Sequence, residues 1–577
     1  MDRRTFLRKP ATAIAASGPA LATGFSANSD PPETVSPFAN KALPTTLARV
    51  TSTLTPYTGP WGYAQAAHLL RRSTFGPTRA EITTAAGQSL TQVLNRLLTV
   101  PAAPAPPVNG FSRDTTVPVG QSWLTTANGP EDYLRRNSLR SWWLNLLLQS
   151  TTLVEKMTLL WSSHFVTEIE EVEDARISYD YIALLRRQAL GNVKQLAKDI
   201  TVAPAMLRYL NGNQNRVGAP NENFGRELLE LFTVGKGPLI GPGNYTYYTE
   251  DDVQAAAKVM TGWRDSNATP DVGSNFTAAR HDTTTKQFSS AFGNATIANQ
   301  GDQEYGALIN LIFDQDETAT ALVRRLYRWF VYYVIDATTE RNIIQPLATQ
   351  LRQNGYNIAP VLRTLLSSEH FFDTLNIGCF IKSPLDFVVG VVRQLEVSFP
   401  AATNVVARYG LWQYLTDVAT GQQQRLGDPP NVAGWAAYWQ TPQYNEIWIN
   451  AVTLPLRNQF TDNLVRQNGI TRNIDGTNHV LKIDVVALVQ GFPATTASDC
   501  NLLIAEFVKL LLPTPLTANQ LAYLNDALLP GLPDFEWTDE WQDFRSTPND
   551  ATKRAAVETK LRALLRQIMG MAEFHLS

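Results

Sequence analysis

The sequence predicts a mainly α-helical protein, a large multi-helix single domain with long decorated loops. Three observations lead to this prediction. Apolar residues recur at helical spacing over most of the chain after Trp61. The composition, 577 residues of which 44% are hydrophobic and 18% charged, is that of a packed globular protein. Residues 463–482 show alternating patterns, which add a small β-hairpin insertion to the helical domain.

The N-terminus resembles an export signal. Residues 3–8 (RRTFLR) follow the order of the twin-arginine motif, a weakly apolar Ala-rich stretch comes next, and residues 20–22 (ALA) suit a cleavage site. The alternative is a chance basic N-terminus. We expect residues 1–22 to be a twin-arginine signal peptide and the Pro-, Ser- and Thr-rich residues 23–60 a flexible lead-in. The mature chain would then lie in the periplasm or on the cell surface.

The helical domain is expected to span residues 61–577. Its first helix ends near Ser73, where a Phe-Gly-Pro turn separates it from a second helix. Residues 99–130, with many Pro, Gly, Ser and Thr, predict a long surface loop. Helical periodicity then returns at 133–149, 153–165 and 178–200, and Pro204 suits the first turn of a further helix.

Residues 221–235 (NENFGRELLELFTVG) predict one amphipathic helix with a polar arc. After it, Thr249 and Asp252 form a capping-box signature for a helix that ends near Gly262. Residues 264–300 are irregular, with short strands expected around 285–292. The remaining segments are helices at 322–335, 358–372 and 384–397, a Pro- and Trp-rich loop at 427–448, and two closing helices.

Several of these stretches, in this order, resemble the bacterial family catalogued as domain of unknown function 1800. The resemblance is carried by residues 69–78 (LLRRSTFGPT), 157–165, 204–235, 248–264, 279–288 and 428–435 (DPPNVAGW). It implies a helical, typically exported protein but supplies no established reaction. The sequence departs from the family pattern near Ser162 and Ser163, where a second His or Asn is usual, and at Thr284, where a Gly is usual.

Other protein classes are disfavoured by what the sequence lacks. It contains no HExxH, GxSxG, GxxxxGK[ST] or Glu-x-x-His motif, which argues against zincin proteases, α/β-hydrolases, P-loop enzymes and ferritin-like oxidases. The formal charge of −3 gives no reason to expect a nucleic-acid partner. After signal removal no apolar run is long enough for a transmembrane segment. Cys379 and Cys500 are expected to be small buried hydrophobes, with one disulfide as the alternative.

The polar arc of residues 221–235 is the first candidate site. Glu222, Arg226 and Glu230 recur at i, i+4 and i+8, with Asn223 and Glu227 beside them. The alternative is a solvated helix face held by i,i+4 ion pairs. An arc with three acids and one Arg but no Lys is unlike an ordinary solubilising face. It also follows a Gly- and Asn-rich turn, where functional loops tend to lie.

Two histidines could complete such a site. His281 and Asp282, with Lys286 four residues later, could bind a metal or act as base and electrostatic partner. The alternative is a loop turn in which Asp282 caps the following Thr residues. His164 closes an otherwise apolar helix, so it is either a satisfied core histidine or a ligand or base facing the acidic arc.

We therefore expect distant residues to converge on one cavity. The predicted catalytic residues are His281, Asp282, Glu227, Arg226 and Lys286. A divalent metal ion, the one cofactor considered, would be held by N and O ligands from His164, Glu222, Glu227, His281 and Asp282. A substrate platform would consist of Trp435, Trp439 and Asn223, because aromatic faces can stack on sugar rings, although most rings of this loop are expected to plug the helical bundle.

Two functions fit these expectations. The first is a metal-assisted or acid–base hydrolase that acts on a cell-envelope or extracellular polymer, with Arg226 and Lys286 countering negative charge. The second is a non-enzymatic surface, assembly or ligand-binding protein, in which the acids and Arg226 form an internal ion-pair network.

Overall fold

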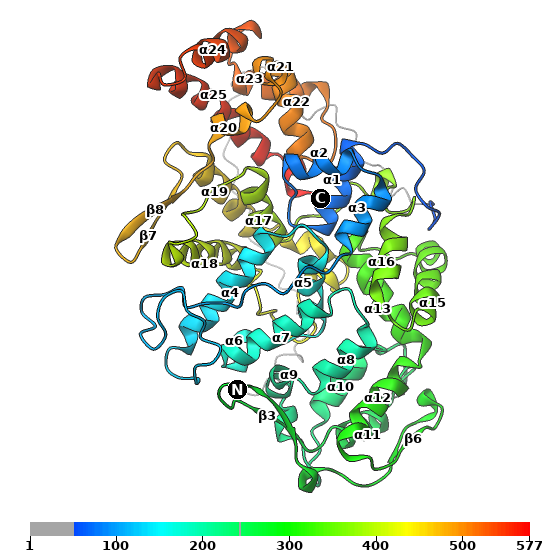
Figure 1. Cartoon of the computed structure of the whole chain (residues 1–577). Coiled ribbons are helices and arrows are strands. Elements are labelled where there is room, and N and C mark those ends of the chain that lie inside the picture. Colours follow the sequence, from blue (N-terminus) through cyan, green and yellow to red (C-terminus); the bar gives the residue numbers. More distant parts are fainter. Residues whose placement is uncertain (1–50, 242–243) are drawn as a thin grey trace, which may run out of the picture.

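A computed structural model describes residues 51–241 and 244–577 (Figure 1). The predicted signal peptide, residues 1–22, and most of the predicted lead-in, residues 23–50, lie outside the described residues. The mainly α-helical class is confirmed, since helices succeed one another along the described chain and the strands occur only as small antiparallel pairs. No helix in this part of the chain is long and apolar enough to cross a membrane.

The first part of the chain is helical as predicted, but the segment predicted at 178–200 is divided into two helices, α7 (Ala175–Arg187) and α8 (Val193–Thr201). Helix α1 ends at Ser73, and residues 99–130 are largely irregular, as expected. The helices of this part are α1 (Tyr63–Ser73), α2 (Arg79–Ala86), α3 (Leu90–Leu97), α4 (Asp132–Leu148), α5 (Val154–His164), α6 (Ile169–Val172), α7 (Ala175–Arg187), α8 (Val193–Thr201) and α9 (Pro204–Tyr209).

The middle of the chain contains the polar helix and three short hairpins. Its helices are α10 (Glu222–Glu230), α11 (Glu250–Val259), α12 (Glu304–Phe313), α13 (Asp316–Phe330), α14 (Ala337–Thr339), α15 (Gln345–Gln353) and α16 (Ile358–Leu366). Its strands are β1 (Leu239–Gly241), β2 (Asn244–Tyr245), β3 (Trp263–Ser266), β4 (Gly273–Phe276), β5 (Lys286–Gln287) and β6 (Thr296–Ile297). Strand β5 lies where short strands are expected, whereas the β1–β2 pair has no counterpart among the sequence predictions.

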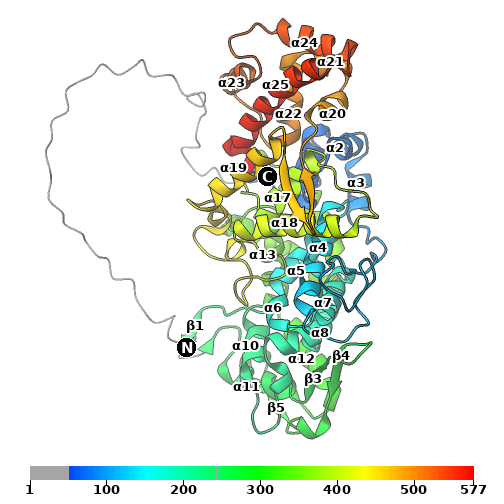
Figure 2. The same ribbon diagram turned by 90° about the vertical axis from the view of Figure 1, so that its left-hand side faces the viewer.

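The last part of the chain completes the helical body. Its helices are α17 (Pro384–Gln394), α18 (Val405–Gly421), α19 (Thr453–Val465), α20 (Val485–Gln490), α21 (Ala494–Ser498), α22 (Cys500–Leu511), α23 (Ala518–Leu528), α24 (Phe535–Ser546) and α25 (Ala551–Gly570). The predicted hairpin is confirmed as β7 (Ile470–Ile474) and β8 (Thr477–Leu481), which pair antiparallel. Figures 1 and 2 both place α20 to α25 at one end of the molecule and α10, α11 and β3 toward the other.

The packing of α10 against α11 fixes the position of the polar helix. Gly225 faces α11 so closely that a Cβ atom there would lie 2.9 Å from the backbone oxygen of Val253. The predicted capping box starts α11, because the Thr249 N–H donates to Asp252 Oδ2 at 2.8 Å. Helix α11 ends at Val259, three residues before Gly262, which adopts a left-handed φ of +94° in the turn that follows. The apolar face of α10 is therefore buried, with Phe224 and Leu228 at most 1% exposed, and its polar arc lies on the less buried side of the helix.

Candidate functional site

A pocket of about 340 Å³ forms where four distant segments meet. They are the end of α5, the end of α10 with the turn that follows, one face of α13, and the loop around Trp439. Its charged and aromatic lining residues are His164, Glu230, Tyr247, Glu317, Arg324, Arg325, Arg328, Tyr438 and Trp439. We call this space the His164 pocket.

His164 is the last residue of α5 and is 5% exposed. Its Nε2 lies 3.0 Å from the backbone oxygen of Phe232, just beyond α10. Because a carbonyl oxygen only accepts hydrogen bonds, Nε2 carries the proton and Nδ1 keeps its lone pair. That buried Nδ1 has no hydrogen-bond partner among the described residues. Burial, and then the nearby charge of Arg325, hold the pKa of His164 well below its usual value, so the ring is neutral.

Helix α13 supplies three arginines to the His164 pocket. Arg324 pairs with Glu317 and, at 2.8 Å, with Glu340. Arg328 donates from Nε to the backbone oxygen of Tyr333 at 3.3 Å. Arg325 makes no hydrogen bond or ion pair with the residues that the structure describes. Burial, and then Arg328, lower the pKa of Arg325 to about 10, which leaves it charged at neutral pH. Arg325 is thus a cation beside His164 without an acid of its own.

The acidic wall of the pocket comes from the end of α10. Glu230 accepts from Lys236 Nζ at 2.5 Å and from the Tyr248 hydroxyl at 2.9 Å, so its carboxylate is held in place. Glu227, one turn earlier, does not line the pocket, and its carboxylate forms no hydrogen bond or ion pair with the described residues. Burial, and then the charge of Glu230, raise the pKa of Glu227 to about 7. Near neutral pH, Glu227 therefore exchanges a proton with solvent.

The other residues of the polar arc lie away from the His164 pocket. The guanidinium of Arg226 donates to both oxygens of Glu250 at 2.6 Å. Glu222, 3.8 Å from Arg226, lines a second hollow at the opposite end of α10. Asn223 is exposed, and its N–H bonds to the side chain of Asn221.

His281 and Lys286 belong to a buried ion-pair network rather than to a pocket. His281 Nε2 lies 2.9 Å from Glu304 Oε1, and Lys286 Nζ lies 2.6 Å from Glu304 Oε2, with the Glu304 side chain 0% exposed. The other ring nitrogen of His281 lies 2.9 Å from the backbone oxygen of Thr261. Asp282 accepts from the N–H of Thr284 at 2.8 Å, which is the loop turn that the sequence analysis gives as the alternative.

The predicted metal set is not brought together. Among the described residues, no group of three or more His, Cys, Asp or Glu side chains is placed to hold a metal ion. His164 lines the His164 pocket, Glu222 lines the hollow at the far end of α10, and His281 contacts Glu304. His164, Glu222, Glu227, His281 and Asp282 therefore do not form one centre.

The predicted substrate platform is divided. Trp435 is 1% exposed and belongs to the core, whereas Trp439 is 37% exposed and lines the His164 pocket. Asn223 does not line the His164 pocket. Of the described cysteines, both Cys379 and Cys500 are free thiols.

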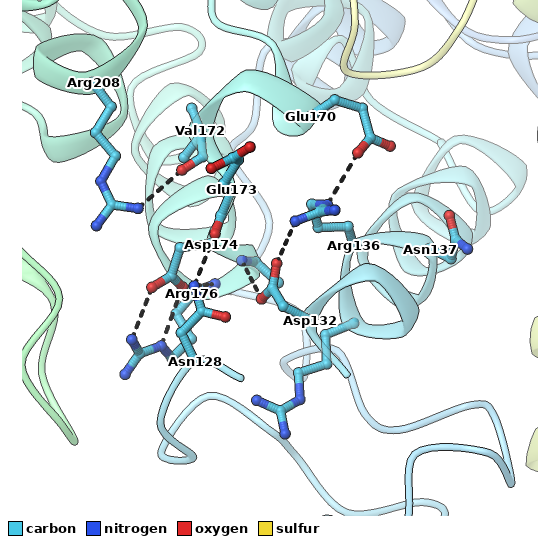
Figure 3. Close-up of polar contacts among 12 residues, drawn as sticks. Asn128, Asp132, Arg136, Asn137, Glu170, Val172, Glu173, Asp174, Arg176 and Arg208 are labelled. Carbon is cyan, nitrogen blue, oxygen red and sulfur yellow. Dashed lines mark hydrogen bonds and ion pairs between the residues drawn. The ribbon is translucent and has the colours of Figure 1, made fainter. Parts of the chain in front are cut away.

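A separate network of acids and arginines connects α4, α6 and the start of α7 (Figure 3). Asp132 accepts a hydrogen bond from Arg136 at 2.7 Å, and Glu170 forms an ion pair with Arg136 at 3.2 Å. Asp174 pairs with Arg176 at 2.8 Å, and both side chains are buried. These residues line none of the pockets described above, so their ion pairs hold helices in place.

Sequence reasoning missed the arginines of α13 and the acid Glu304. The signal for the arginines is the segment LVRRLYRWF, which places Arg324 and Arg328 one turn apart on an otherwise apolar helix. Glu304 carries no local signal, because its partners lie 18 and 23 positions away.

Fold and pocket together define a large helical protein with an arginine-lined polar pocket. The chain belongs to the family described as protein of unknown function (DUF1800), whose model matches residues 68–576. The resemblance stated from the sequence is thereby confirmed. Comparison with curated proteins and with solved structures gave no match.

Proposed function

We propose that the protein is a hydrolase whose active site is the His164 pocket and whose substrate carries a negative charge. One observation carries this proposal: His164 lines the pocket together with Arg325, and its neutral, buried imidazole has an Nδ1 lone pair without a hydrogen-bond partner among the described residues. A buried polar atom without a partner costs free energy, so such atoms call for a functional reason.

The residues suit base-assisted hydrolysis. Nδ1 of His164 accepts a proton from a water molecule while the water oxygen attacks the electrophilic carbon or phosphorus of the substrate. The bond to the leaving oxygen breaks, and that oxygen takes the proton back from the imidazolium. Arg325 and Arg328 stabilise the negative charge that develops, and Glu230, on the opposite wall, favours the transient imidazolium.

The low pKa of His164 fits an anionic substrate. In the free pocket Arg325 disfavours a proton on the ring. A bound anionic group offsets the charge of Arg325, which raises the pKa of His164 toward its usual value and makes Nδ1 a stronger base. The base would thus be strengthened by the substrate itself.

We further propose that the chain is exported by the twin-arginine route and that its substrate is a cell-envelope or extracellular polymer. The RRTFLR motif and the ALA sequence at residues 20–22 support export. The proposal uses no metal-bound water, because the described residues offer no group of three suitable ligands.

A second candidate function is ligand binding without chemistry. The observation in its favour is that three of the predicted catalytic groups are already paired with acids outside the predicted set. Arg226 pairs with Glu250, and both His281 and Lys286 contact Glu304. In that case the His164 pocket would hold an anionic ligand and Nδ1 would accept one of its hydrogen bonds.

The replacement His164→Gln separates the two candidates. For a hydrolase, we expect turnover of acidic polysaccharides or of phosphate and sulfate esters to fall by about 10²–10⁴-fold, because a general base is lost. The measurement is kcat and KM for each substrate that the wild type cleaves. His479→Gln, on the distant strand β8, is the matched control and should behave as wild type.

A His164→Gln variant that keeps wild-type turnover would refute the role of His164 as the general base. If the wild type binds an anionic ligand through Arg325 but turns none over, the binding function is favoured.

A further inference from the structure

A second arginine-lined hollow lies at the N-terminal end of α10. Its volume is about 640 Å³, and its polar lining includes Asn213, Arg216, Asn221, Glu222, Arg264 and Arg280. These residues come from the turn before α10, from β3 and from the segment just before His281. We call this space the Arg216 hollow.

The charges of the Arg216 hollow are unbalanced. Arg216, Arg264 and Arg280 make no ion pair with any of the described residues. The Nε of Arg280 is buried and has no hydrogen-bond partner in this part of the chain. The one acid among the lining residues, Glu222, lies 3.8 Å from Arg226 and is partly neutralised by it. Three cations that share one hollow repel one another unless an anion binds between them.

The direction of α10 adds to this positive potential. Asn221 caps the helix by accepting from the N–H of Asn223 at 3.0 Å, so the helix N-terminus opens at the Arg216 hollow. The first N–H groups of a helix carry a partial positive charge that favours anions. Helix and arginines therefore act in the same sense.

The His164 pocket and the Arg216 hollow lie at the two ends of the polar arc of α10. Glu222 lines the Arg216 hollow and Glu230 lines the His164 pocket. These residues are eight positions apart, which corresponds to roughly 12 Å along the helix axis and to a rotation of about 80° around it. A ligand that lies along the polar arc of α10 reaches both pockets only if it is extended.

We infer that the substrate is an extended acidic polysaccharide, which places one charged group in the His164 pocket and another in the Arg216 hollow. This inference rests on the proposed function where it concerns cleavage at the His164 pocket. Binding of the polysaccharide across both pockets does not depend on that function. A polysaccharide is favoured over other polyanions by Trp439 and Tyr247, whose rings line the His164 pocket and can stack on sugar rings. The formal charge of −3 argues against nucleic acid.

The test is a comparison of chain lengths with the full-length protein. The double variant Arg216→Gln/Arg264→Gln should bind a long oligogalacturonate about tenfold more weakly than wild type, because the second attachment point is lost. Its affinity for the galacturonate monomer at the His164 pocket should not change, since neither Arg216 nor Arg264 lines that pocket. Arg113→Gln/Arg545→Gln, two exposed arginines elsewhere, is the control with the same loss of charge.

The outcomes are distinct from those of the proposed function. Equal loss of oligomer affinity in the test and control variants would overturn the second subsite. Tighter binding of polyphosphate or single-stranded DNA than of the acidic oligosaccharide would overturn the substrate class. Oligomer binding that depends on Arg216 and Arg264 without any cleavage would uphold this inference and refute only the hydrolase. If turnover is lost in His164→Gln while oligomer binding is unchanged in the double variant, the hydrolase is upheld and this inference is overturned.

Discussion

His281 has partners at both ring nitrogens, whereas His164 keeps one nitrogen free. The sequence singles out both, but it favours His281 as the reactive residue because an Asp follows it. The side chain that decides the matter, Glu304, is remote in sequence, so no local pattern predicts it. At His164 the apolar helix is predictable, but the free Nδ1 depends on a carbonyl 68 residues away.

The buried network of His281, Glu304 and Lys286 leads to a prediction about stability. Glu304→Ala should lower the free energy of unfolding by about 3–5 kcal/mol, because Lys286 and His281 lose the carboxylate that they share in the protein interior. Urea denaturation measures the change.

The control for Glu304 is an exposed pair. Glu250→Gln breaks the contact with Arg226, whose side chains are 37% and 33% exposed, and should cost no more than about 1 kcal/mol. Equal costs for the two variants would contradict a structural role for Glu304.

Individual elements were largely predictable where the signal is local. The capping box at Thr249, the end of α1 at Ser73 and the β7–β8 hairpin follow from short patterns. The β1–β2 pair was not predicted, since β1 and β2 comprise three and two residues and show no alternation long enough to read.

The pocket itself is a product of packing between elements. Residues of α5, α10 and α13 line it, and these helices are separated by dozens of residues or more. The sequence shows which residues of each helix are polar, but it does not show which of these polar residues meet in space. That is why Arg226 and Glu222 were expected at one site with His164, and why Arg325 was not considered.

For the whole molecule, the class and the family follow from the sequence, and the division into leader, lead-in and one helical domain stays a prediction. Composition and periodicity suffice for the class, because they sum over many residues. The predicted location of the protein rests on Arg3 and Arg4 and on the residues that follow them, which lie outside the described residues.

The export prediction can be tested directly. Replacing Arg3 and Arg4 together by Lys should retain the precursor in the cytoplasm, because the twin-arginine route reads the guanidinium pair and not charge alone. Cell fractionation and N-terminal sequencing of the mature chain provide the measurement, with Arg49→Lys as the control. Undiminished appearance of the processed double variant in the periplasm would contradict export by this route.

The central claim is that His164 presents a neutral, unpartnered Nδ1 to an anion-binding pocket. Nitrogen-15 NMR of histidine-labelled protein tests it most directly, with the His164 signals assigned by their loss in His164→Gln. We predict the Nε2–H tautomer near neutral pH and a pKa below the usual value, which rises in Arg325→Gln and on addition of an anionic ligand. An Nδ1–H tautomer, or a pKa that neither Arg325→Gln nor an anion changes, would contradict the claim.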